Sequence, residues 1–130
     1  MNTWLLASAL LICLIGAVHS VMGERRIFHP WVQQPPPGLR VFHRQILRAS
    51  WHLPTLLGFG QAAALAWLGA APAADLPAVG LQQALLASLA CGVVACGVLV
   101  LWLTRGRHQG GTAMLAAAAL MLVGLVQVGQ

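Results

Sequence analysis

Four long apolar stretches occupy most of this chain and constrain its fold more than any other feature. They run from about residue 3 to 22, 46 to 71, 79 to 103 and 112 to 128. A helix needs about 20 mostly apolar residues, with a range of roughly 17 to 25, to cross the hydrocarbon core of a bilayer. We therefore expect an all-α, polytopic membrane protein. Short connections make sequence neighbours antiparallel, so residues 1–130 should form one up-and-down bundle of four transmembrane helices.

The low content of charged residues excludes a water-soluble domain. Of the 130 residues, 59% are hydrophobic and only 7% are charged, whereas a soluble domain carries about 25% charged residues. The seven basic residues are all arginines, and the only acids are Glu24 and Asp75. This amount of charge cannot cover the surface of a soluble fold, so the protein is expected in a membrane.

The arginines predict the orientation of the bundle. They cluster at the first and third connections and are absent from the second connection and from both ends: Arg25, Arg26, Arg40, Arg44, Arg48, Arg105 and Arg107. The positive-inside rule then puts the first and third connections in the cytoplasm and both termini outside. We expect a multi-pass protein of the bacterial inner membrane whose arginines meet anionic lipid headgroups. A nucleic-acid partner is not expected, because no aromatic and basic reading surface accompanies these residues.

Residues 24–45 are expected to form a cytoplasmic loop that rests on the membrane surface. Gly23 could end the first helix just before it, as a glycine often does. Residues 35–37 are three consecutive prolines, which cannot continue a helix. Phe28, Trp31 and Phe42 lie near arginines, and aromatic rings prefer the headgroup layer. The second helix should start near Val41 in the headgroup layer and enter the hydrocarbon near Arg48.

Two histidines within the apolar stretches are the first candidates for chemistry. Ionisable groups inside a bilayer are costly and point to function unless they can reach the interface. From the helical rise, His19 lies roughly 5 Å inside the end of the first helix and His52 roughly 6 Å inside the start of the second. The two rings can therefore meet at one depth between antiparallel neighbours. Glu24, the only acid on the cytoplasmic side, follows closely in sequence.

Three interpretations of these residues stay open. In the first, His19, Glu24 and His52 bind a transition metal, with Zn or non-haem Fe the best match to two imidazoles and one carboxylate. In the second, His19 and His52 are the axial ligands of a b-type haem, and Arg44 and Arg48 bind its propionates. In the third, the same side chains tie helix ends together by hydrogen bonds, while the Arg48 side chain reaches the phosphate layer.

The functional prediction follows from these interpretations. It is a small integral inner-membrane protein with a metal or cofactor site at the cytoplasmic membrane edge, built from His19, Glu24, Arg48 and His52. One alternative is an accessory subunit of a larger membrane complex without catalysis of its own. A second is a metal-dependent membrane enzyme that acts on a lipid-borne substrate with Glu24 as general base. Whether the chain is an enzyme stays open at this stage.

A stripe of small residues predicts association of the protein with itself or with another membrane protein. Ser88, Gly92 and Cys96 recur at every fourth position of the third apolar stretch. Such a pattern lets a second helix approach closely. A homo-oligomer or a complex with a membrane-protein partner is therefore expected.

Two short strings resemble a group of small four-helix bacterial inner-membrane proteins. They are HSxxGE, over residues 19–24, and RxxWH, over residues 48–52, with an arginine-bearing loop between them. The likeness covers mainly residues 15–60. The group has no established activity, so the resemblance implies a fold and a membrane location and leaves the function open.

Overall fold

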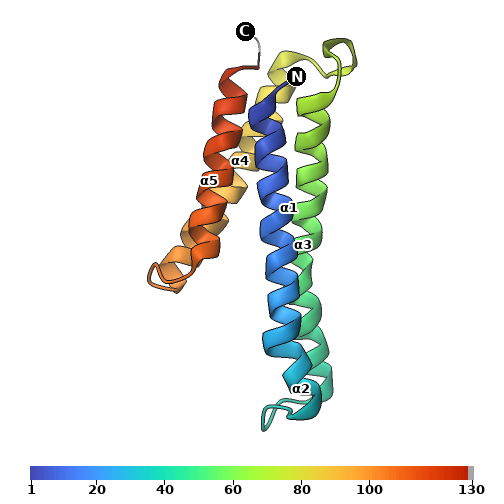
Figure 1. The fold of residues 1–130 in the computed structure, drawn as a ribbon, viewed down its shortest axis with the longest axis vertical. Helices are drawn as coiled ribbons and strands as arrows, with labels where there is room; N and C mark the ends of the chain where they lie inside the picture. Colours follow the sequence, from blue (N-terminus) through green and yellow to red (C-terminus); the bar gives the residue numbers. More distant parts are fainter. Residues whose placement is uncertain (129–130) are drawn as a thin grey trace.

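The computed structural model describes residues 1–128 of the chain, and all regular structure in this range is helical. It has four long helices: α1 (Thr3–Gly23), α3 (Val41–Ala70), α4 (Val79–Leu103) and α5 (Gln109–Val126). Each of these helices, α1 taken with its continuation, is long and apolar enough to cross a membrane. They alternate in direction, so the start of α1 and the end of α5 lie at one end of the bundle, here called the terminal end (Figure 1). The all-helical, membrane-spanning fold is confirmed.

The first helix does not end at Gly23. It continues through a π-helical turn, η1 (Glu24–Phe28), into the short helix α2 (His29–Gln33), which makes one helical segment of 31 residues. Gly23 has φ −59° and ψ −46°, so it is an ordinary helical residue. Pro30 stands in the first turn of α2, where its missing N–H is tolerated. The irregular connection is therefore residues 34–40, much shorter than the loop predicted over 24–45.

One large side chain from each long helix meets at the centre of the bundle. Leu5, Leu65, Leu86 and Met121 are each at most 1% exposed, and they belong to one hydrophobic cluster. The helices pack as two hairpins, α1 with α3 and α4 with α5, and the main contact between the hairpins is that of α1 with α5. The members of this cluster that come from α1 are Leu5, Ala9 and Ile12, all in the first half of that helix. The core therefore lies in the half of the bundle that is near the terminal end.

Hydrogen bonds fix the register of α1 against α5. The Ser8 hydroxyl donates to the carbonyl of Ala117 at 2.9 Å, and both residues are fully buried. The side-chain amide of Asn2 donates to the carbonyl of Gly124, also at 2.9 Å. In a medium without water, such side-chain bonds to carbonyls of a neighbouring helix help to hold helices together. They align the two helices at the terminal end.

The small residues of α4 have two different surroundings. A Cβ added to Gly97 would lie 3.1 Å from the Gly111 carbonyl, so this glycine lets α4 and α5 approach closely. Ser88, Gly92 and Cys96 instead lie on the exposed face of α4, and a Cβ on Gly92 would meet nothing within 4 Å. The contact between α4 and α5 therefore does not use the predicted stripe, and the association expected from it stays a prediction.

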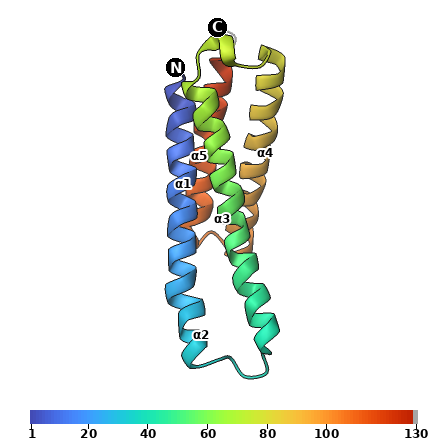
Figure 2. The ribbon, with the colours of Figure 1, turned by 90° about the vertical axis from the view of Figure 1, so that its right-hand side faces the viewer.

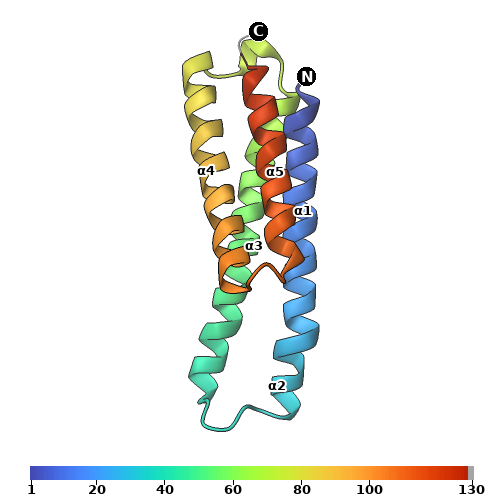
Figure 3. The same ribbon diagram turned by 90° about the vertical axis from the view of Figure 1, so that its left-hand side faces the viewer.

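The hairpin of α1, α2 and α3 is longer than that of α4 and α5. At 1.5 Å per residue, the segment Thr3–Gln33 spans about 46 Å and the 18 residues of α5 span about 27 Å. Because α1 and α5 are aligned at the terminal end, the excess of about 20 Å lies at the opposite end. Figures 2 and 3 show α2 and the first part of α3 extending past the connection between α4 and α5. We call this end, residues 20–48, the hairpin end.

Candidate functional site

Four polar side chains meet where α1 and η1 face α3, and we call them the polar cluster: Ser20, Glu24, Arg48 and His52. Glu24 and Arg48 form the strongest pair. The Arg48 Nε donates to Oε2 of Glu24 at 3.0 Å, and its Nη2 donates to Oε1 of the same carboxylate. Such a two-point contact between guanidinium and carboxylate fixes the geometry of both groups.

His52 links the carboxylate to a hydroxyl group. Its Nε2 lies 3.4 Å from Oε2 of Glu24, and its Nδ1 is hydrogen-bonded to the hydroxyl of Ser20. Ser20 and Glu24 are four residues apart on one helix, and Arg48 and His52 are four apart on the other, so each pair shares a face. The cluster is thus a direct result of two helical repeats facing each other.

His19 lies beside the cluster and has a different partner. Its ring stacks on the indole of Trp51, with centroids 4.4 Å apart and planes 7° from parallel. The indole Nε1 donates to the backbone carbonyl of His19 at 3.1 Å. Gly23 makes room for this indole, since an added Cβ would lie 2.6 Å from Cδ1 of Trp51. Trp51 is therefore the side chain that joins the helices next to the polar cluster.

Phe28 bounds the cluster on the side of the hairpin end. Its side chain is 4% exposed, and its ring centroid lies 6.0 Å from that of Trp51 and 6.1 Å from that of His52. On the opposite side, the hydroxyl of Thr55 donates to the carbonyl of Gly16 at 3.3 Å. The cluster is left partly open, because Arg48 is 52% exposed, Glu24 34% and His52 31%.

The predicted metal ligands are not brought together as one set. Within residues 1–128, no three His, Cys, Asp or Glu side chains are grouped so that they could hold a metal ion. Glu24 and His52 meet, together with Arg48, while His19 stacks on Trp51. Iron or zinc at His52 would also have to displace the bonds of its ring to Ser20 and Glu24. Metal and haem at these residues stay predictions, which metal analysis and a visible absorption spectrum of the purified protein would test.

Sequence reasoning missed Ser20, Trp51 and Gly23 as parts of this site. Serine and glycine are common in membrane helices, and a tryptophan near the interface is ordinary, so none of the three is conspicuous alone. The available signal was spacing, because Ser20 precedes Glu24 by one helical repeat and Gly23 follows His19 by one. A polar residue one repeat from an acid shares its face and is the first partner to consider.

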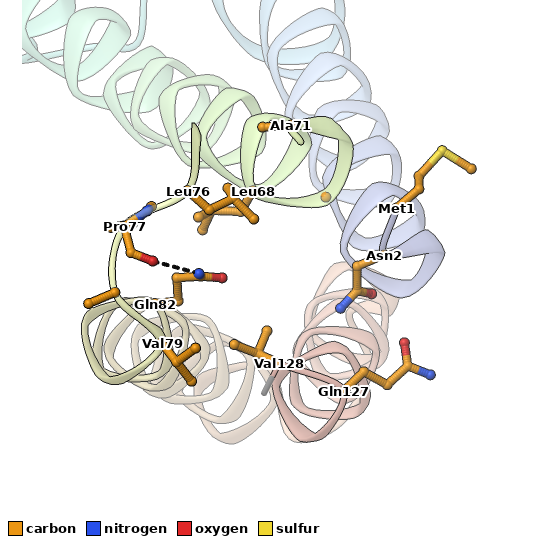
Figure 4. A pocket seen from close by; sticks show the side chains of 12 residues that line it. Met1, Asn2, Leu68, Ala71, Leu76, Pro77, Val79, Gln82, Gln127 and Val128 are labelled. Atoms are coloured by element: carbon orange, nitrogen blue, oxygen red, sulfur yellow. Dashed lines mark hydrogen bonds between the residues drawn. The ribbon is translucent and has the colours of Figure 1, made fainter. Parts of the chain in front are cut away.

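A hollow lies at the terminal end, between the ends of the four long helices. It has a volume of about 540 Å³ and no ionisable side chain among its lining residues. Two amides lie at its wall (Figure 4): Gln82 donates to the carbonyl of Pro77 at 2.7 Å, and Asn2 is bonded to α5. Because its lining side chains include no acid, base or nucleophile, the polar cluster is the better candidate for chemistry.

The fold defines the class of this protein as a small multi-pass membrane protein, with four helices in residues 1–128 that are long and apolar enough to span a membrane. No protein-family model, curated protein or solved structure matches the chain. The function must therefore be derived from the residues of the chain itself.

Proposed function

We propose that this chain is a multi-pass protein of the bacterial inner membrane that holds an arginine-rich helical hairpin in the anionic headgroup layer of the cytoplasmic side. The observation that supports it best is the difference in length between the two hairpins. The hydrocarbon core is about 30 Å thick, and the headgroup layers bring the bilayer to about 40–45 Å. Helix α5, about 27 Å long, fits the first length, whereas the segment Thr3–Gln33, about 46 Å long, also passes through a headgroup layer.

The charge of the hairpin end fits this location. Five of the seven arginines belong to it, and four of them are exposed: Arg25, Arg26, Arg40 and Arg48. Only Arg48 is paired with an acid among the described residues. The fifth, Arg44, is partly buried and donates to the carbonyl of Trp31 at 3.0 Å, which ties α2 to α3. An end with exposed arginines that have no acidic partner is suited to bind lipid phosphates, each basic residue near an anionic surface contributing about 1 kcal/mol.

Phosphatidylglycerol is expected to stabilise the protein more than phosphatidylcholine does, because a ligand that binds only the folded state raises its stability. The measurement is the midpoint of thermal unfolding in detergent micelles as a function of the fraction of each lipid. The variant with Arg25→Gln, Arg26→Gln and Arg40→Gln should bind phosphatidylglycerol at least tenfold more weakly, since it lacks three basic groups. Its midpoint in micelles without phosphatidylglycerol should stay close to that of the original protein.

The matched control neutralises the other arginine-bearing connection, with Arg105→Gln and Arg107→Gln. This variant should keep most of the stabilisation by phosphatidylglycerol, and 0.5 M salt should weaken the effect in both proteins because exposed charges are screened. If both variants lost the stabilisation by phosphatidylglycerol to the same extent, lipid binding would depend only on the net charge of the protein. That result would contradict a role of the hairpin end.

Orientation is tested by reporter fusions. A periplasmic alkaline phosphatase attached after Gln130 is expected to be active, and one inserted between Gly106 and Arg107 is expected to be inactive, because the arginine-bearing connections should stay in the cytoplasm. Green fluorescent protein at the same two positions should give the opposite result. Phosphatase activity at position 106 and none at the end of the chain would overturn the proposed orientation.

A further inference from the structure

The line of hydrogen bonds from Ser20 through His52 to Glu24 is not explained by lipid binding at the hairpin end. Arg48 is the one member of the polar cluster whose side chain could bind a lipid phosphate through a permanent positive charge. Ser20 contributes a hydroxyl that is bonded to an imidazole nitrogen, and the other nitrogen of the same ring faces a carboxylate. Hydroxyl, imidazole and carboxylate in this order are the groups that activate a serine as a nucleophile.

The positions of the protons follow from the partners. The Glu24 carboxylate is held by two donors of Arg48, so it is ionised and can only accept hydrogen bonds. The His52 Nε2 that faces it must therefore carry the ring proton in the neutral imidazole. Nδ1 is then unprotonated and accepts the hydrogen bond from the Ser20 hydroxyl. The neutral ring is thus in the tautomer that a general base needs.

The depth of Ser20 in the membrane suggests the bond that it would attack. From Thr3 to Ser20 the helix rises about 26 Å, which is close to the full thickness of the hydrocarbon core. With the hydrocarbon beginning at Thr3, where the apolar stretch begins, Ser20 is expected where the acyl chains of lipids end and their ester groups begin. The side chains of Glu24 and His52 are about one third exposed, so a lipid in contact with this part of the hairpin can approach the cluster.

We propose that Ser20 is the nucleophile of an acyl-transfer site that acts on the ester group of a membrane-borne lipid, with His52 as general base and Glu24 as the group that orients it. The Ser20 Oγ forms a bond to the carbonyl carbon while its proton moves to Nδ1 of His52. The bond from that carbon to the alkoxy oxygen breaks, and the leaving alcohol takes the proton from His52. A water molecule then gives a proton to Nδ1 of His52 while its oxygen forms a bond to the acyl carbon. The bond from that carbon to the Ser20 Oγ breaks, Oγ takes the proton back from His52, and the fatty acid is released. This proposal does not depend on lipid binding by the arginines.

The test uses the purified full chain in detergent and a long-chain alkyl fluorophosphonate, which forms a bond from phosphorus to an activated serine and releases fluoride. Intact-mass spectrometry is expected to show one adduct per chain, and peptide mapping should assign it to Ser20. Ser20→Ala should abolish the adduct. His52→Gln should slow its formation at least 100-fold, as expected for loss of a general base. Ser8→Ala, which removes a buried hydroxyl far from the cluster, should leave the rate unchanged.

A second variant keeps the test decisive if Ser20→Ala does not fold. In Ser20→Cys, the new thiol should react with iodoacetamide at neutral pH at least tenfold faster than the exposed thiols of Cys91 and Cys96, because His52 can take its proton. Adding His52→Gln should remove this difference. Absence of an adduct in the folded protein, or labelling that maps to Ser88 or that keeps its rate in His52→Gln, would overturn the proposal. Those outcomes would mean that the cluster only holds the helices together.

Discussion

Gly23→Ala is expected to destabilise the protein by about 1–3 kcal/mol, the usual effect of adding a methyl group to a packed site. A Cβ at this position would lie 2.6 Å from Cδ1 of Trp51 and closer still to its Nε1. The indole must then move, which breaks its hydrogen bond to the His19 carbonyl and its stacking on the His19 ring. The measurement is the free energy of unfolding in mixed micelles, followed by tryptophan fluorescence.

The matched control for this prediction is Gly92→Ala. It also removes a glycine from a helix, but the added Cβ meets nothing within 4 Å, so stability should be unchanged or higher by up to about 1 kcal/mol. Trp51→Ala should cost stability by itself and should make Gly23→Ala harmless. If Gly23→Ala and Gly92→Ala behaved alike, the close contact between α1 and α3 at this point would be refuted.

Glu24→Gln is the second substitution with a large expected effect, a loss of about 1–2 kcal/mol. It removes the charge that faces Arg48 and His52 while keeping the shape of the side chain. Exposed ion pairs contribute up to about 1 kcal/mol, and pairs shielded from water lose more when one partner is removed. Glu24 is 34% exposed and is held by two bonds from Arg48. The loss of stability in Glu24→Gln should therefore fall between that of an exposed pair and that of a shielded pair.

Asp75→Asn is the control, because it removes the only other acid of the chain from the turn η2 (Ala73–Asp75). It should leave the free energy of unfolding within about 0.5 kcal/mol of the original value, as surface substitutions usually do. The double variant with Glu24→Gln and Arg48→Gln should lose less than the sum of the two single variants, since both remove the same contact. Strict additivity would mean that the pair contributes nothing to stability.

The positions of the four membrane helices could be predicted from the sequence, whereas the full extent of the first could not. Hydropathy marks the part of a helix that lies in hydrocarbon, and it located α4 at residues 79–103 as observed. The apolar stretch of α3 begins near residue 46, and the expected start of the helix near Val41, within the headgroup layer, is confirmed. The continuation of α1 to Gln33 was missed. Polar residues and Pro30 suggested a loop there, but a helix outside the hydrocarbon needs no apolar pattern and tolerates a proline in a first turn.

Part of the candidate site was also accessible from the sequence. Polar residues in a membrane segment are costly, and this reasoning selected Glu24, Arg48 and His52, which do meet. It also selected His19, whose ring instead stacks on Trp51. The choice between an imidazole that faces a carboxylate and one that faces an indole depends on how α1 and α3 are rotated against each other. That rotation is set by the contact of Gly23 with Trp51, which no periodicity of polar residues reveals.

The division of the bundle into two hairpins has a consequence for how the protein is made. Contacts between the hairpins run mainly along α1 and α5, and α5 is synthesised after α1, α3 and α4. The pair of α1 and α3 can thus enter the membrane and form the contacts of the polar cluster before the second pair is synthesised. We expect the second hairpin to insert as a separate unit and then to dock on the first. Docking forms the hydrogen bond from the Ser8 hydroxyl to the Ala117 carbonyl.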